Sequence, residues 1–132
     1  MPITALYAGL LVPIFIILCV RVIRVRRGAK VSVGDGGDVS LLRRMRVQAN
    51  FAEYVPLALV LMGLVESLKV DWRLIHALGI GLLIARIAHA VGMSPAKDIF
   101  ALRVTGVVLT FIVLIAAAIL CVAGSILGTP FS

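Results

Sequence analysis

The chain contains few charged and few aromatic residues for its length. Of its 132 residues, 14% are charged and 6% are aromatic, whereas 62% are hydrophobic and the mean hydropathy is +1.17. Soluble domains are about one quarter charged and about half apolar, so this composition excludes a soluble enzyme and a disordered chain. Two cysteines are too few for the disulfide framework of a small secreted domain. The sequence therefore predicts an integral membrane protein.

Acidic residues are also scarce, with six Asp and Glu against thirteen Lys and Arg and a net charge of +7. In a membrane protein such an excess gathers in cytoplasmic loops. Nucleic-acid binding needs a basic surface interleaved with aromatic residues, which this sequence lacks, so we expect no nucleic-acid partner. Most of the cations flank the first predicted connection, namely Arg21, Arg24, Arg26, Arg27, Lys30, Arg43, Arg44 and Arg46. We therefore expect the first and third loops to face the cytoplasm, with both termini outside.

Long apolar runs predict four transmembrane helices within a single domain. About 20 apolar residues are enough to cross a bilayer. The predicted helices cover residues 3–25, 41–68, 72–91 and 96–125 of the single domain 1–132. Short connections make neighbouring helices antiparallel, so we expect an all-α, up-down four-helix membrane bundle. Asp38 or Ser40 is expected to cap the second helix, since short polar side chains accept hydrogen bonds from the first free N–H groups.

Several other residues have expected structural roles. Tyr7 and Trp72 lie near the outer membrane edge, where amphipathic rings anchor a helix at the interface. Gly79 and Gly106 are expected at points where helices pack closely, because a residue without a side chain lets two backbones approach.

Motifs that would bind a nucleotide or a metal ion are missing from this sequence. There is no Walker lysine, no GxGxxG and no HExxH. His76 and His89 have no ligand-like partners at the spacing of a metal site, so we expect no bound metal.

Ionisable residues within the predicted helices mark the expected site, because each costs about 2.5 to 3.5 kcal/mol to insert into a bilayer. The second helix carries four polar residues at i, i+4, i+7 and i+8, within about 100° of one face: Arg46, Asn50, Glu53 and Tyr54. Arg86 and His89 near the end of the third helix, and Arg103 near the start of the fourth, lie in the same half of the bilayer. These groups are expected to line a polar pocket that opens to the cytoplasm.

Arginines beside one carboxylate suit a ligand that has carboxylates and an ammonium group, such as an amino acid or small peptide. The alternative is that Glu53 pairs with Arg86 or Arg46 only to neutralise a buried charge. Spacing alone leaves both interpretations open.

Residues 46–56, RVQANFAEYVP, resemble the helix signature RxQxNxxEYxP of the MAPEG family, the membrane-associated proteins in eicosanoid and glutathione metabolism. The resemblance extends to the whole chain through the basic first loop with Arg26 and Arg27, through Ala85-Arg86 and through Arg103. It is most similar to the branch of leukotriene C4 synthase and microsomal glutathione transferase 2.

The resemblance implies a homotrimer that binds glutathione between subunits on the cytoplasmic side. It implies a glutathione S-transferase-like enzyme, or peroxidase, that acts on small lipophilic electrophiles from the bilayer. Arg103 is the implied catalytic residue, which stabilises the glutathione thiolate. The implied glutathione-binding residues are Arg46, Gln48, Asn50, Glu53, Tyr54, Arg86, His89, Arg26 and Arg27. A bacterial inner membrane is the expected location.

The chain departs from this branch at two positions. His89 and Met93 stand where its members carry tyrosines. A non-catalytic bundle that keeps a ligand-binding or assembly role is therefore the alternative. A small multidrug exporter ranks last, because such exporters carry a carboxylate within the first helix and this chain has none there.

Overall fold

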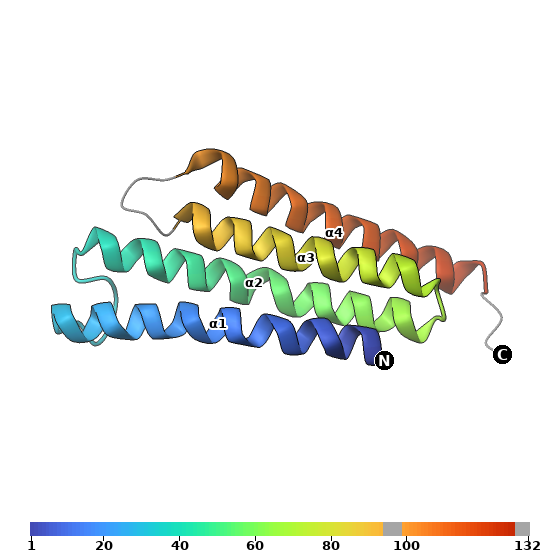
Figure 1. Ribbon diagram of the computed structural model, residues 1–132, viewed down its shortest axis with the longest axis horizontal. Coiled ribbons are helices and arrows are strands. Elements are labelled where there is room, and N and C mark those ends of the chain that lie inside the picture. Colours follow the sequence, from blue (N-terminus) through green and yellow to red (C-terminus); the bar gives the residue numbers. More distant parts are fainter. Residues whose placement is uncertain (94–98, 129–132) are drawn as a thin grey trace.

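Four long helices form an antiparallel bundle in the computed structural model, which describes residues 1–93 and 99–128 (Figure 1). The helices are α1 (Pro2–Ala29), α2 (Val39–Ser67), α3 (Trp72–Met93) and α4 (Phe100–Ile126). Each is long and apolar enough to cross a membrane. Within the described residues, α2 and α3 contact each other and both outer helices, α1 and α4. The predicted all-helical membrane bundle is confirmed.

The first connection and the described ends of α3 and α4 that precede and follow residues 94–98 lie at the same end of the bundle (Figure 1). We call this the first-loop end. The start predicted for the fourth helix, at residue 96, lies outside the described residues.

The first helix is longer than the apolar pattern predicted, since it continues from residue 25 to Ala29. Arginine is a good helix former, and its long side chain lets the charge reach water while the stem stays on the helix surface. The helix ends at Lys30, which adopts a left-handed conformation with φ 54°. A change to positive φ ends the α-helical hydrogen-bond pattern, so the helix stops after the basic stretch rather than before it.

Side chains satisfy free N–H groups at the starts of three of the described helices. At α3, the Asp71 carboxylate accepts from the Arg73 N–H at 2.9 Å. The carboxylate of Asp38 accepts a hydrogen bond from the Leu41 N–H at 3.0 Å, so the predicted cap of α2 is confirmed for Asp38. Glu66, near the end of α2, accepts from the N–H groups of Ile3 at 2.9 Å and Thr4 at 2.8 Å. Glu66 thus caps α1 from a neighbouring helix, an acidic group at the positive end of the helix dipole.

The interface of α3 and α4 is closest at two glycines. A Cβ at Gly106 of α4 would lie 2.7 Å from the carbonyl oxygen of Ala85 on α3. A Cβ at Gly92 of α3 would lie 2.5 Å from the backbone nitrogen of Arg103 on α4. The expectation for Gly106 as a close-packing point is confirmed, and Gly92 holds the backbone of Arg103 directly against α3.

Tyr7 is not an interfacial anchor, contrary to the prediction. Its side chain is 5% exposed, and its hydroxyl is hydrogen-bonded to His76 Nδ1 at 2.8 Å. A Cβ at Gly79 would overlap the Tyr7 ring, so Gly79 makes room for it. A position near the end of a helix does not decide whether a ring faces lipid or the neighbouring helix. Trp72, at the same end, is 59% exposed and suits the interface.

Candidate functional site

Arg86 lies inside the bundle, on the face of α3 that meets α2 and α4. It is 1% exposed. Its Nη2 donates to Asn50 Oδ1 at 2.6 Å, and its Nη1 donates to Thr110 Oγ1 at 3.3 Å. The guanidinium carbon also lies 5.7 Å from the centre of the Phe51 ring, within the range of a cation–π contact. Three helices therefore hold this buried charge.

The contact with Arg86 fixes the orientation of the Asn50 amide. A guanidinium group only donates hydrogen bonds, so the Asn50 oxygen must face it. The amide NH2 group is then turned away from Arg86, and it has no hydrogen-bond partner among the described residues. Asn50 is half-buried. Its two N–H donors are therefore not used by Arg86.

Arg46 and Glu53 lie on the outer side of α2. Both side chains are exposed in this single chain, although α2 is one of the membrane-length helices. Neither makes a hydrogen bond or ion pair with another described residue. Glu53 lies about 10 Å farther along the helix than Arg46, from the rise of an α-helix. The alternative that Glu53 pairs with Arg86 or Arg46 is thus wrong for the isolated chain, because Arg86 turns to Asn50.

Tyr54 is half-buried beside these residues, and its ring meets the Phe111 ring edge-on at 5.4 Å between centres. This contact joins the polar face of α2 to the middle of α4. It leaves Tyr54 at the boundary between the bundle interior and the outer face of α2.

His89 faces inward rather than toward this outer face. It is 4% exposed, and its Nδ1 lies 3.4 Å from Arg86 Nη2. Arg103 is half-buried at the first-loop end, with its guanidinium carbon 5.4 Å from the centre of the Phe100 ring and Nη1 3.9 Å from Met93 Sδ. The close approach of the Arg103 backbone to Gly92 fixes the point from which the Arg103 side chain extends.

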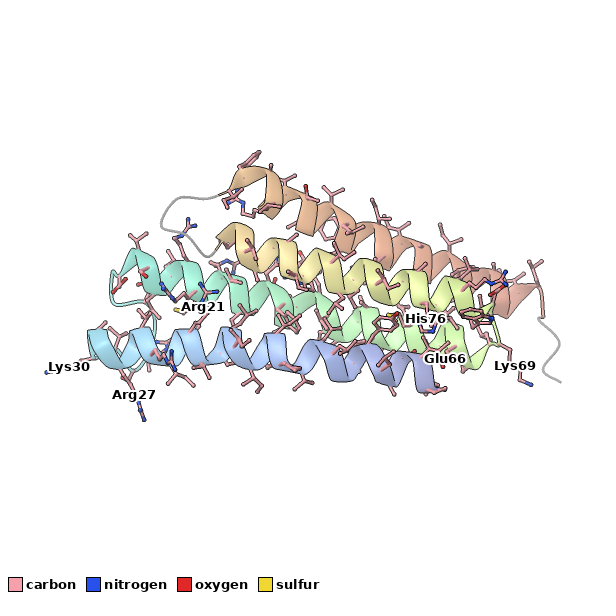
Figure 2. The ribbon with its side chains drawn as sticks, viewed as in Figure 1. Arg21, Arg27, Lys30, Glu66, Lys69 and His76 are labelled. Carbon is pink, nitrogen blue, oxygen red and sulfur yellow. The ribbon has the colours of Figure 1, made fainter. Side chains whose placement is uncertain are left out.

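Three of the predicted residues point elsewhere. The amide nitrogen of Gln48 lies 3.6 Å from Cys19 Sγ on α1, inside the same chain. Arg26 turns toward the first loop and α2, donating to the carbonyl oxygen of Gly34 at 2.6 Å and reaching Met45 Sδ at 3.5 Å. Arg27 is exposed and extends away from the other helices (Figure 2). The structure thus gathers Asn50 and Arg86, and leaves Arg27 apart from them.

Sequence reasoning missed Thr110 and Phe51, which complete the surroundings of Arg86. A threonine in the long uncharged run of the fourth helix is a weak signal, because its hydroxyl normally bonds to the carbonyl one turn earlier. Thr110 does this too, donating to the Gly106 carbonyl at 2.7 Å. Its lone pairs remain free to accept from Arg86. The usable signal was the arginine itself, because a buried guanidinium needs hydrogen-bond acceptors on the helices around it.

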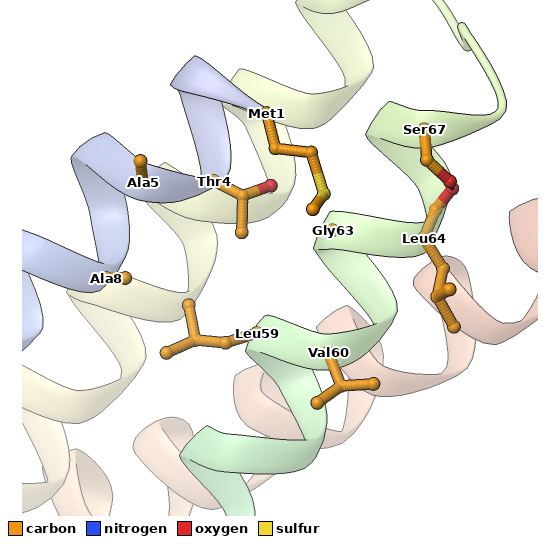
Figure 3. Close-up of a pocket in the computed structure, with 9 residues that line it drawn as sticks. All are labelled: Met1, Thr4, Ala5, Ala8, Leu59, Val60, Gly63, Leu64 and Ser67. Atoms are coloured by element: carbon orange, nitrogen blue, oxygen red, sulfur yellow. Dashed lines mark hydrogen bonds between the residues drawn. The ribbon is translucent and has the colours of Figure 1, made fainter.

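An apolar groove lies apart from this polar site. It has a volume of about 510 Å³ and opens between the start of α1 and the end of α2 (Figure 3). Its walls are mainly apolar and small, and they include Ala5, Ala8, Val60 and Gly63. It lies at the end opposite the first loop, away from Arg46 and Arg103. The chemistry is therefore expected at the polar residues rather than in this groove.

Comparison with known proteins agrees with this arrangement of helices. The profile of the MAPEG family matches residues 4–123. The inner membrane protein YecN of Escherichia coli strain K12 is 36% identical over 90 residues, which cover 68% of this chain and 69% of that protein. YecN of E. coli O6:H1 strain CFT073 shows the same identity and coverage. From the family match and the four membrane-length helices, the chain is an integral membrane protein that belongs to the MAPEG family.

Proposed function

We propose that this chain is a glutathione-dependent transferase or peroxidase of the inner membrane that acts on small lipophilic electrophiles. In this proposal it works as a homotrimer, and each glutathione molecule binds between two subunits near the first-loop end. That end faces the cytoplasm, because it carries most of the basic residues. The family, which includes glutathione-dependent enzymes, and the inner membrane relative support this direction.

The observation that carries the proposal is the exposure of Arg46 and Glu53 on a membrane-length helix. A charged side chain that faces lipid near the bilayer centre is costly, and such groups normally face a protein interior or a wet cavity. A second subunit placed over this face of α2 would remove both charges from lipid. A polar ligand between the subunits would then satisfy them.

The chemistry of these side chains fits the amino-acid end of glutathione. Glu53 accepts hydrogen bonds and suits the ammonium group. The Asn50 NH2 group, which Arg86 does not use, suits the carboxylate on the same carbon atom. Arg46 offers a planar pair of donors for the second carboxylate, at the other end of the tripeptide. Arg26, which is turned toward α2, closes the site from the first loop.

Arg103 supplies the catalytic function in this scheme. A free thiol has a pKa of about 8.5, and a cation beside it favours the thiolate, which is the nucleophile. The thiol proton leaves to solvent, and the thiolate sulfur then attacks the electrophilic carbon of the substrate. A C–S bond forms as the bond from that carbon to its leaving group breaks, and the leaving group departs with the electron pair as an anion. Arg103 stabilises the negative charge on sulfur before the attack.

Glutathione binding to the detergent-purified chain tests the proposed site. We expect calorimetry to detect binding, and we expect Arg46→Ala to abolish it. Arg73→Ala is the matched control, because it removes an exposed arginine at the opposite end of the bundle. Absence of binding by the unmodified chain, or equal binding by Arg46→Ala, would overturn the proposal.

Arg103→Ala tests catalysis separately from assembly. We expect this variant to remain trimeric by light scattering and to bind glutathione, while conjugation to a model electrophile is lost. Unchanged turnover would remove Arg103 from the mechanism.

The burial of His89 against Arg86 favours a second candidate function, a non-catalytic subunit that binds a ligand. Glutathione binding without conjugation of any electrophile tested would support that second function.

A further inference from the structure

The cations at the end of α1 divide into two sets. Arg26 is half-buried and turned toward the first loop and α2. Arg27 and Lys30 are exposed and extend from the end of α1 away from the other helices (Figure 2). This outward pair, Arg27 and Lys30, has no role in the proposed glutathione site. The surface around the two residues is therefore considered as a separate binding site.

A hollow of about 270 Å³ lies beside this pair. It is lined by Ile23, Arg26, Arg27, Lys30, Val31 and Ser32. Ile23 is one helical turn before Arg27 and so lies on the same face of α1. The hollow thus has an apolar wall on the membrane side and basic and hydroxyl groups on the water side.

The outer face of α1 continues the apolar wall into the membrane. Ile16, Val20, Ile23, Arg27 and Lys30 follow one another at alternate steps of four and three residues, which places them along one stripe. The three apolar members are exposed by 52%, 37% and 51%. The stripe is therefore apolar along the membrane and cationic where α1 ends, the same order as the acyl chain and headgroup of a lipid.

The end of α1 is held in a fixed shape. The Val31 N–H bonds to the Arg26 carbonyl at 3.0 Å, which ties the chain back onto the last turn. Arg26 binds the Gly34 carbonyl, and a Cβ at Gly36, where φ is +58°, would overlap the Val31 side chain. These contacts position the hollow before any ligand arrives. They also satisfy a carbonyl at the helix end that would otherwise repel an anion.

We propose that this hollow binds the phosphate headgroup of an anionic phospholipid, with an acyl chain along the stripe Ile16–Val20–Ile23. Arg27 and Lys30 contact the phosphate, and the exposed Ser32 hydroxyl is positioned to donate to it. Basic pockets at membrane depth recognise anionic headgroups in this way. The simpler explanation is that the cations only complement the negative end of the α1 dipole, and it predicts no preference among lipids.

Native mass spectrometry of the detergent-solubilised full chain tests the proposal, with phosphatidylglycerol and phosphatidylcholine of identical acyl chains as probes. We expect the unmodified chain to prefer phosphatidylglycerol. The double variant Arg27→Gln/Lys30→Gln should reduce this preference about thirtyfold, because each of the two cations contributes about 1 kcal/mol to binding an anionic headgroup. The control Lys69→Gln/Arg73→Gln removes the same charge at the opposite end and should keep the preference. A preference that survives in Arg27→Gln/Lys30→Gln, or is absent from the unmodified chain, would overturn the proposal.

Two further measurements separate charge from folding and a lipid from free phosphate. The exchange Arg27→Lys/Lys30→Arg changes the same two side chains but keeps both charges, and it should show the preference for phosphatidylglycerol. The loss in the glutamine variant then follows from the missing charges and not from altered folding at these two positions. Glycerol 3-phosphate, the headgroup without acyl chains, should bind much more weakly than the lipid, and Ile23→Gln should weaken lipid binding only. Equal affinity for glycerol 3-phosphate and lipid would overturn the assignment of a lipid.

Discussion

The contact between Arg86 and Asn50 gives the sharpest prediction, because one atom of Asn50 is assigned to stability and another to the ligand. Asn50→Asp replaces the NH2 group by oxygen and keeps the atom that accepts from Arg86 at 2.6 Å. Asn50→Leu removes both. A hydrogen bond to a charged group contributes about 1.5 to 3 kcal/mol to stability. We expect Asn50→Leu to lose about that amount of stability and Asn50→Asp to lose little.

Glutathione binding should respond differently from stability. Both variants lose the N–H donors that we assign to a ligand carboxylate, and Asn50→Asp adds a negative charge there. We expect both to bind glutathione at least about tenfold more weakly, since about 1.4 kcal/mol corresponds to a factor of ten. Unfolding in a denaturing detergent, followed by circular dichroism, measures stability, and calorimetry measures binding.

The two readouts can each refute the reasoning. If Asn50→Leu unfolds at the same detergent fraction as the unmodified chain, Arg86 does not depend on Asn50. If Asn50→Asp keeps its affinity for glutathione, the amide NH2 group does not face the ligand. Ser67→Ala is a suitable control for a change of polarity on α2, because the Ser67 hydroxyl bonds to the Leu64 carbonyl at the end of the helix opposite the first loop.

Three further predictions follow from contacts at the interior and at the helix ends. Thr110→Val removes the weaker 3.3 Å contact to Arg86 and should cost about 1 kcal/mol in the same unfolding assay, less than Asn50→Leu; an equal loss would reverse their order. Gly106→Leu should destabilise the bundle by more than Thr110→Val, because a Cβ there meets the Ala85 carbonyl at 2.7 Å, and undiminished stability would show that α3 and α4 separate easily. Glu66→Gln weakens the cap of α1 and should lower stability by about 0.5 to 2 kcal/mol. Added salt should reduce this difference between the two proteins, because it screens the charge of Glu66 in the unmodified chain.

The fold was predictable because each helix is marked by its own residues. Long apolar runs, the breaks between them and the cap at Asp38 are local signals that need no knowledge of neighbours. The end of α1 was placed too early because apolar character was used to find it. Arginine favours helix as much as many apolar residues do, so hydropathy ended before the helix did.

The site was less predictable because it depends on which way each helix faces. The spacing of Arg46, Asn50 and Glu53 correctly placed them along one side of α2. It did not show that Asn50 lies at the edge of that side and reaches inward to Arg86, while Arg46 and Glu53 stay exposed. Rotation of α3 about its own axis decides whether Arg86 faces a ligand or the interior. That rotation is set by packing between helices at glycines such as Gly92 and Gly106. The sequence of one helix alone does not reveal this packing.

The burial of Arg86 has a consequence for how the chain enters its membrane during synthesis. An arginine within a membrane-spanning helix costs up to about 2.5 to 3.5 kcal/mol on insertion into lipid. Its acceptors are on the helix synthesised before it, at Asn50, and on the helix synthesised after it, at Thr110. Because α3 reaches its full set of partners only when α4 has emerged, α2, α3 and α4 should leave the insertion machinery as a group rather than one at a time.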